Sequence, residues 1–142
     1  METQEIYRGR LIDHLQLVVN DLSQSRTFYK AVFKVLEIPI GGEAEDHIWA
    51  DELFISSKGS DAAIGKTTGR HHLAFQAKSK EVVDKFYEIA LKSGGKDNGK
   101  PGERKYHPGY YAAFILDPDG NNIEAVYHGP AKKSADSIKI TF

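Results

Sequence analysis

Two histidines and one glutamate are the residues whose types and spacing could hold a metal ion. His14 and His72 each lie at the start of an apolar segment, and Glu124 lies in a third apolar segment. Two imidazoles and one carboxylate suit Zn, Mn, Fe, Ni or Co and leave coordination positions open for water or substrate. The chain has no cysteine, so any metal must be bound by His, Asp or Glu. The sequence therefore predicts a divalent metal ion and leaves its identity open.

The elements that must position these residues follow one pattern that occurs twice. A predicted strand over 12–19 is followed by a predicted helix over about 22–36, with an N-cap candidate at Asp21. A second predicted strand over 71–76 is followed by a second predicted helix, which begins after Ser79 and ends at Gly94–Gly95.

A constant offset of 58 residues relates the two copies. It aligns His14-Leu15 with His72-Leu73, and Phe28-Tyr29 with Phe86-Tyr87. Adjacent residues point to opposite faces of a strand, so the offset with His14 selects His72 over His71 as the ligand.

Further strands are expected after each helix. They lie at 48–50 and 53–56 in the first copy, and at 111–116 and 122–127 in the second, where Asp117-Pro118-Asp119-Gly120 forms a turn. The segment 96–109, rich in Gly and Pro, is predicted to be an irregular loop, and 138–142 alternates like an edge strand.

Composition excludes several classes of protein. The formal net charge is −1, so the sequence gives no sign of the clustered basic surface that binds nucleic acid. No apolar run is long enough to span a membrane, and residues 1–10 lack the apolar core of a secretory signal. We expect a single cytoplasmic domain over residues 1–142, without nucleic-acid or membrane partners.

The sequence resembles the vicinal oxygen chelate superfamily, which includes glyoxalases, bleomycin-resistance proteins and extradiol dioxygenases. The resemblance rests on Ile12-Asp13-His14-Leu15, on His72-Leu73-Ala74-Phe75, and on Asp117-Pro118-Asp119-Gly120-Asn121-Asn122-Ile123-Glu124. The segment 99–111 is similar to an uncharacterised glyoxalase-like subfamily rather than to true glyoxalase I.

The resemblance implies an α+β fold of two βαβββ modules that form a curved, mostly antiparallel mixed sheet around a metal-lined cleft. Module one would span about 11–58 and module two about 69–128, followed by a C-terminal tail over 129–142. The resemblance also implies a small-molecule substrate and is compatible with a homodimer.

The carboxylate that glyoxalase I carries on the last strand of its first module is in doubt here. Phe54 is expected at the position that corresponds to Glu124, with Glu52 two residues earlier on the same face. Glu52 is therefore a candidate fourth ligand or base only if the register shifts, and a solvated strand-end role is the alternative. Phe54 would then narrow the cleft.

His107 and Tyr111 are the candidates for substrate contact, because the segment that holds them precedes the hairpin with Glu124. A packing role for each is an equal alternative. Trp49 is expected in the core or the cleft wall.

Three functions remain open from the sequence. The first is a metal-dependent lyase, isomerase or transferase acting on a small molecule that chelates the metal through adjacent oxygens. The second is a metal-free drug-binding protein of the bleomycin-resistance type. The third is a small ring-cleaving dioxygenase, although typical members carry four modules and this chain has two.

Overall fold

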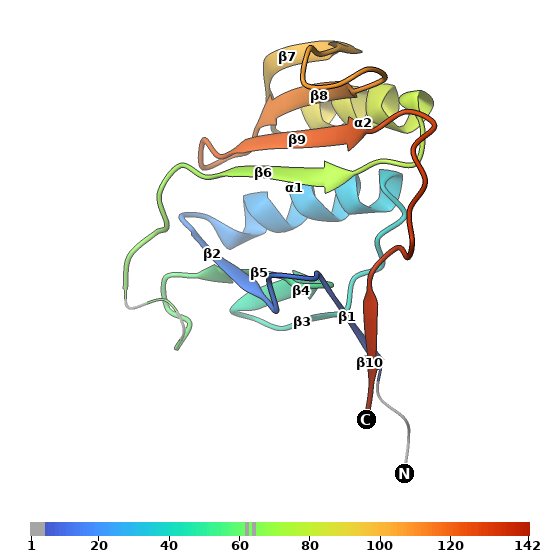
Figure 1. The fold of residues 1–142 in the computed structure, drawn as a ribbon. Coiled ribbons are helices and arrows are strands. Elements are labelled where there is room, and N and C mark those ends of the chain that lie inside the picture. Colours follow the sequence, from blue (N-terminus) through green and yellow to red (C-terminus); the bar gives the residue numbers. More distant parts are fainter. Residues whose placement is uncertain (1–4, 62, 64) are drawn as a thin grey trace.

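Two similar units lie one above the other in the computed structural model (Figure 1), which describes residues 5–61, 63 and 65–142. A four-stranded sheet lies at the top of the view, another lies at the bottom, and helix α1 lies between them. The fold is α+β, with strands in mixed sheets and no closed barrel among the described residues.

Module one forms the lower sheet, in the strand order β3-β4-β5-β2. Strands β2 and β5 are parallel, and the other pairs are antiparallel. Its elements are β2 (Leu15–Val19), α1 (Leu22–Val35), β3 (Gly42–Glu43), β4 (His47–Ala50) and β5 (Leu53–Ser57).

Module two repeats this topology in the order β6-β9-β8-β7, again with one parallel pair, β6 and β9. The predicted pair of βαβββ modules is thereby confirmed, with one hydrogen-bonded sheet for each module. Its elements are β6 (His72–Gln76), α2 (Lys80–Lys92), β7 (Lys96–Glu103), β8 (Tyr111–Leu116) and β9 (Asn122–Tyr127).

Both helices begin at side-chain caps that share the 58-residue offset. The carboxylate of Asp21 accepts a hydrogen bond from the N–H of Gln24, and the hydroxyl of Ser79 accepts one from the N–H of Val82. Gly94 follows α2 with a φ of 103°, the left-handed conformation that glycine adopts at low cost.

The prediction of an irregular loop over 96–109 is wrong for most of its length. Residues Lys96–Glu103 form strand β7, which pairs with β8 through register shifts next to Gly99 and Gly102. β7 is an edge strand, where Pro101, which lacks an N–H, is tolerated and bulges absorb extra residues.

A two-stranded ribbon stands apart from both sheets. Strand β10 (Ile138–Thr141), predicted from its alternation, pairs with β1 (Glu5–Arg8), which the sequence analysis did not predict. In Figure 1 the ribbon runs down beside the lower sheet.

A buried polar network joins the two modules beside one shared hydrophobic core. The core includes Phe28 of α1 and Phe86 of α2, both fully buried. The hydroxyl of Tyr29 on α1 donates a 2.5 Å hydrogen bond to Asp117, in the turn between β8 and β9. Burial, reinforced by the charge of Asp117, raises the pKa of the Tyr29 phenol well above its usual value, so it remains a donor.

No helix among the described residues has the length and apolar character needed to cross a membrane.

We predict that Tyr29→Phe lowers the free energy of unfolding by about 1–3 kcal/mol, because the buried carboxylate of Asp117 loses a donor. Denaturant unfolding measures this change. Tyr87→Phe is the matched control, because Tyr87 occupies the corresponding place on α2 and is only partly buried. Equal losses from the two changes would contradict a special role for the Tyr29–Asp117 hydrogen bond.

Candidate metal and substrate site

His72 and Glu124 come together on the outer face of module two. The β6–β9 register places Ala74 opposite Glu124. His72 lies two residues before Ala74, so its side chain points to the same face of the sheet as that of Glu124. His72 Nε2 lies 3.0 Å from Glu124 Oε1. The Glu124 residue is 2% exposed, whereas the His72 side chain is half exposed.

The other ring nitrogen of His72 determines the tautomer. His72 Nδ1 lies 3.0 Å from the carbonyl oxygen of Asn122, which can only accept, so Nδ1 carries a hydrogen. In a neutral ring, Nε2 then presents a lone pair to the Glu124 carboxylate. A proton or a cation is needed between the two atoms.

Tyr110 is a further contact of Glu124, and the sequence analysis missed it. Its hydroxyl donates a short hydrogen bond to Glu124 Oε2. Burial, followed by this hydrogen bond, raises the pKa of the Tyr110 phenol well above its usual value. Counting back in steps of two from Phe114, which pairs with Glu124, reaches Ala112 and then Tyr110, and this alternation was available in the sequence.

Tyr111, which was expected to contact substrate, lies on the other face of the sheet. Its hydroxyl donates a 2.6 Å hydrogen bond to Asp84 on α2, and Lys80 lies over its ring. The hydrogen bond to Asp84 raises the pKa of Tyr111 to about 12. This position fits the packing alternative, because α2 covers that face.

His107 lies close to Tyr110 and His128. His107 Nδ1 bonds the carbonyl of Pro108, and His107 Nε2 lies 2.8 Å from His128 Nδ1. The ring of Tyr110 contacts both imidazoles edge-on, with centroids 5.2 and 5.5 Å away. The two histidines therefore border the outer face on which Glu124 lies.

Module one contributes a different set of side chains at the corresponding places. Gln16 pairs with Phe54, as Ala74 pairs with Glu124, so the structure puts Phe54 where module two has its carboxylate. The ring of Phe54 stacks on Trp49 at 5.4 Å. Gly41 and Gly42 make room for the indole, because a Cβ at either position would collide with it.

His14 lies just before β2, next to Phe54. The two rings meet edge-on at 5.8 Å, and His14 Nδ1 lies 2.7 Å from Asp13 Oδ1. The hydrogen bond from His14 lowers the pKa of Asp13, so the carboxylate accepts and the Nδ1 of His14 donates. Like His72, His14 thus leaves Nε2 available to a metal ion.

Glu52 lies in the turn between β4 and β5, where Asp51 adopts a φ of 46°. Its carbonyl accepts a hydrogen bond from the N–H of Leu15. Its side chain borders a hollow of about 1000 Å³ between the modules, whose lining does not include His14, His72 or Glu124.

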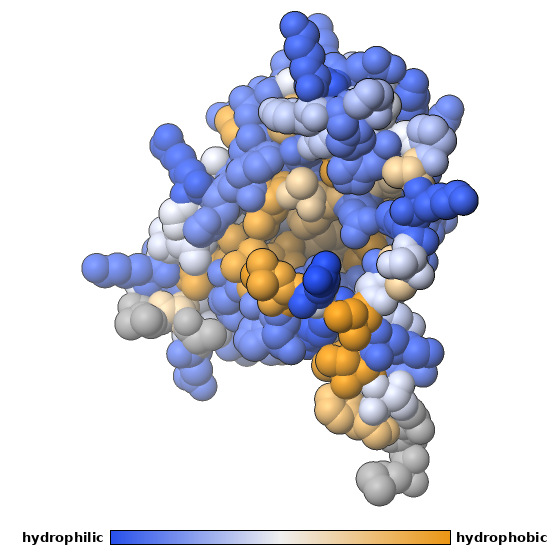
Figure 2. All heavy atoms as spheres, viewed as in Figure 1, coloured by the Kyte–Doolittle hydropathy of each residue, from blue (hydrophilic) through white to orange (hydrophobic). Residues whose placement is uncertain are grey.

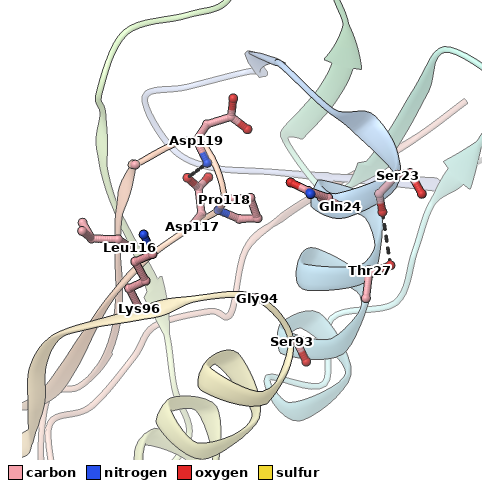
Figure 3. A pocket seen from close by; sticks show the side chains of 11 residues that line it. Ser23, Gln24, Thr27, Ser93, Gly94, Lys96, Leu116, Asp117, Pro118 and Asp119 are labelled. Carbon is pink, nitrogen blue, oxygen red and sulfur yellow. Dashed lines mark hydrogen bonds between the residues drawn. The ribbon is translucent and has the colours of Figure 1, made fainter.

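Within one chain, His14 of module one does not share a site with His72 and Glu124 of module two. Across residues 5–61, 63 and 65–142, no three His, Asp or Glu side chains come close enough together to hold a metal ion. A second pocket, of about 670 Å³, lies between α1 and the turn after β8 (Figure 3). Its lining includes Ser23 and Asp119 and, like that of the hollow, none of the three predicted ligands.

Comparison with known proteins gives the family. Residues 11–125 match the model of the Glyoxalase/Bleomycin resistance protein/Dioxygenase superfamily. The chain belongs to this superfamily. None of the curated proteins matches the chain.

Solved structures of the superfamily have the same fold. A glyoxalase/bleomycin resistance protein from Albidiferax ferrireducens T118 is 28% identical, with a TM-score of 0.69 over 82% of this chain and 98% of that one. A glyoxalase-related enzyme from Fulvimarina pelagi is 17% identical, with a TM-score of 0.68 over 92% and 97%. A lactoylglutathione lyase from Agrobacterium tumefaciens is 20% identical, with a TM-score of 0.58 over 83% and 93%. The last two likenesses concern the fold alone.

We predict that His14 and His72 are both the Nδ1–H tautomer when neutral, because each Nδ1 faces an oxygen that accepts. Long-range ¹⁵N–¹H NMR spectra of the neutral rings would show a protonated Nδ1 and an unprotonated Nε2 in both. His71, next to His72, is the internal control, because its side chain is exposed. An Nε2–H tautomer at His72 would contradict the prediction.

Proposed function

We propose that this protein is a metal-dependent enzyme of the glyoxalase type, with His72, Glu124 and His14 as ligands of one divalent ion. The observation that carries the proposal is the 3.0 Å approach of His72 Nε2, in a ring that the carbonyl of Asn122 orients, to the buried carboxylate of Glu124. The substrate would be a small molecule that chelates the ion through two adjacent oxygens.

The spacing of the two donor atoms suits this ligand set. Two ligands at about 2.1 Å from one ion, in adjacent positions at a right angle, lie about 3.0 Å apart. His72 Nε2 and Glu124 Oε1 have that separation. The carbonyl of Asn122 and the carboxylate of Asp13 orient the two imidazoles, as outer partners of metal-bound histidines commonly do. The ion would act as a Lewis acid on the substrate oxygens.

We propose further that the site is completed by a second copy of the chain. Strands β2 and β6 are each the edge strand of a sheet. His14 directly precedes β2, and His72 is the first residue of β6. A twofold dimer that places β2 of one copy beside β6 of the other brings His14 to the partner copy's ligand pair. The same operation forms two equivalent sites.

The hollow between the modules supports this assembly. Figure 2 shows apolar side chains lining it, and the lining includes Leu15 of β2 together with Leu73, Ala74 and Gln76 of β6. Ala74 and Gln76 share the exposed strand face with His72. A second copy that docks across β2 and β6 would remove this apolar surface from water.

The residues around the proposed metal site favour some types of reaction over others. Phe54 lies where a second carboxylate would be needed for a proton-transfer isomerisation, so we favour a lyase or transferase activity over glyoxalase isomerisation. Tyr110 donates to Glu124 and orients it, and the protonated phenol would lie beside a substrate bound at Glu124.

The alternative of a metal-free binding protein is favoured by one observation, the aromatic wall of Trp49 and Phe54. Such a wall can bind a planar ligand by stacking. A requirement for metal in ligand binding separates the two functions.

We predict that His72→Ala and Glu124→Gln each lower metal affinity by more than about 100-fold, because each removes a ligand. His71→Ala and Glu52→Gln are the matched controls and leave affinity nearly unchanged. Calorimetric titration with Zn²⁺ or Ni²⁺ measures the affinities. An equal loss in Glu52→Gln would restore the ligand set with four residues, and unchanged affinity in Glu124→Gln would refute the site.

We predict that a heterodimer of one His14→Ala chain and one Glu124→Gln chain, isolated with two different tags, binds one metal ion. In a shared site, the intact His14 of one chain meets the intact Glu124 of the other, which leaves one complete site per dimer. If each site belonged to a single chain, every site in this heterodimer would be defective. Metal content of the heterodimer and both homodimers distinguishes these arrangements.

A further inference from the structure

Arg104 places a positive charge over Phe114, the ring that lies next to His72. Its guanidinium carbon lies 5.3 Å from the ring centroid of Phe114. The ring of Phe114 stacks in turn on His72, with centroids 6.0 Å apart. One aromatic ring therefore contacts both the cation and the proposed metal ligand.

The glycines of β7 leave the space that the guanidinium occupies. A Cβ at Gly102 would lie 3.0 Å from Arg104 Nη1. A Cβ at Gly99 would lie 2.9 Å from the Phe114 ring and 3.5 Å from Arg104 Nη2. A side chain at Gly102 would crowd the guanidinium, and one at Gly99 would collide with the Phe114 ring on which it lies.

Backbone groups hold Arg104 in place. Its Nη2 donates a 2.6 Å hydrogen bond to the carbonyl of Lys100, and its Nη1 donates to the carbonyl of Glu103. The N–H of Arg104 bonds the carbonyl of Tyr110, which ties the residue to the segment that reaches Glu124. A guanidinium has five N–H groups, so these two side-chain bonds leave donors for a ligand.

The half-buried cation has no acidic partner within ion-pair distance among the described residues. The acidic residues of β7 bond elsewhere: Glu103 pairs with Lys80 on α2, and Asp97 accepts from the N–H of Gly99. A partly desolvated charge without a counter-ion is unfavourable, and an anionic ligand would compensate it.

We propose that the substrate carries a carboxylate in addition to the two oxygens that chelate the metal, and that Arg104 binds this carboxylate. This inference rests on the proposed function, because it assigns the class of substrate for the same site. The site would then select anionic chelators over neutral ones of the same shape.

The test compares two chelators that differ only in a carboxylate, catechol and 3,4-dihydroxybenzoate, by calorimetric titration of the metal-loaded protein. The wild type should bind 3,4-dihydroxybenzoate about tenfold more tightly or better. Arg104→Gln should abolish this preference and leave catechol binding unchanged. Lys105→Gln, which removes a neighbouring exposed charge, should retain the preference. A preference that persists in Arg104→Gln, or is absent from the wild type, would overturn the proposal.

A second measurement separates this inference from the metal site. If neither chelator binds, the proposed function fails, and Arg104 is tested in metal-free protein with benzoate. The side-chain ¹⁵N NMR signals of Arg104 should shift at millimolar benzoate in the wild type, and the same shift should occur in Lys105→Gln. Signals that do not move would overturn the carboxylate assignment independently of the metal.

Discussion

The buried carboxylate of Asp117 is the interaction on which the arrangement of the two modules depends. It accepts hydrogen bonds from the hydroxyl of Tyr29, from the N–H groups of Asp119 and Asn121, and from the Asn121 side chain. These bonds shape the turn before β9 and attach it to α1 of module one. Strand β9 carries Glu124, so the same network that joins the modules also fixes the register of the proposed ligand. A buried charge is tolerated here because each oxygen has two donors.

Local signals in the sequence were sufficient for most of the fold. The caps at Asp21 and Ser79 and the Asp-Pro-Asp-Gly turn are short-range features, and the structure contains all of them. The alignment of Phe54 with the position of Glu124 followed from the correspondence between modules that the resemblance implies, and the register confirms it.

Features that depend on distant partners escaped the sequence analysis. Strand β1 has no apolar pattern of its own and is a strand only because β10 pairs with it. Strand β7 was expected to be a loop, since bulges next to its glycines conceal the alternation. The side chain of Tyr110, rather than Tyr111, faces Glu124, and this depends on which face α2 covers. Strand alternation in the sequence already places Tyr110 on the same face as Phe114, but which face of the sheet α2 covers is a tertiary property that the sequence did not supply.

The ribbon of β1 and β10 has a consequence for how the chain acquires its structure during synthesis. Its partners, such as Ile6 and Ile140, are almost the whole chain apart, so their pairing carries a large loop-closure entropy. Each βαβββ unit can close over far shorter separations, whereas β1 must wait for β10 to leave the ribosome. A nascent chain would therefore hold a complete first module with β1 still unpaired. The ribbon is then the last hydrogen-bonded element to form. Because it is separate from both four-stranded sheets, its loss would leave them intact.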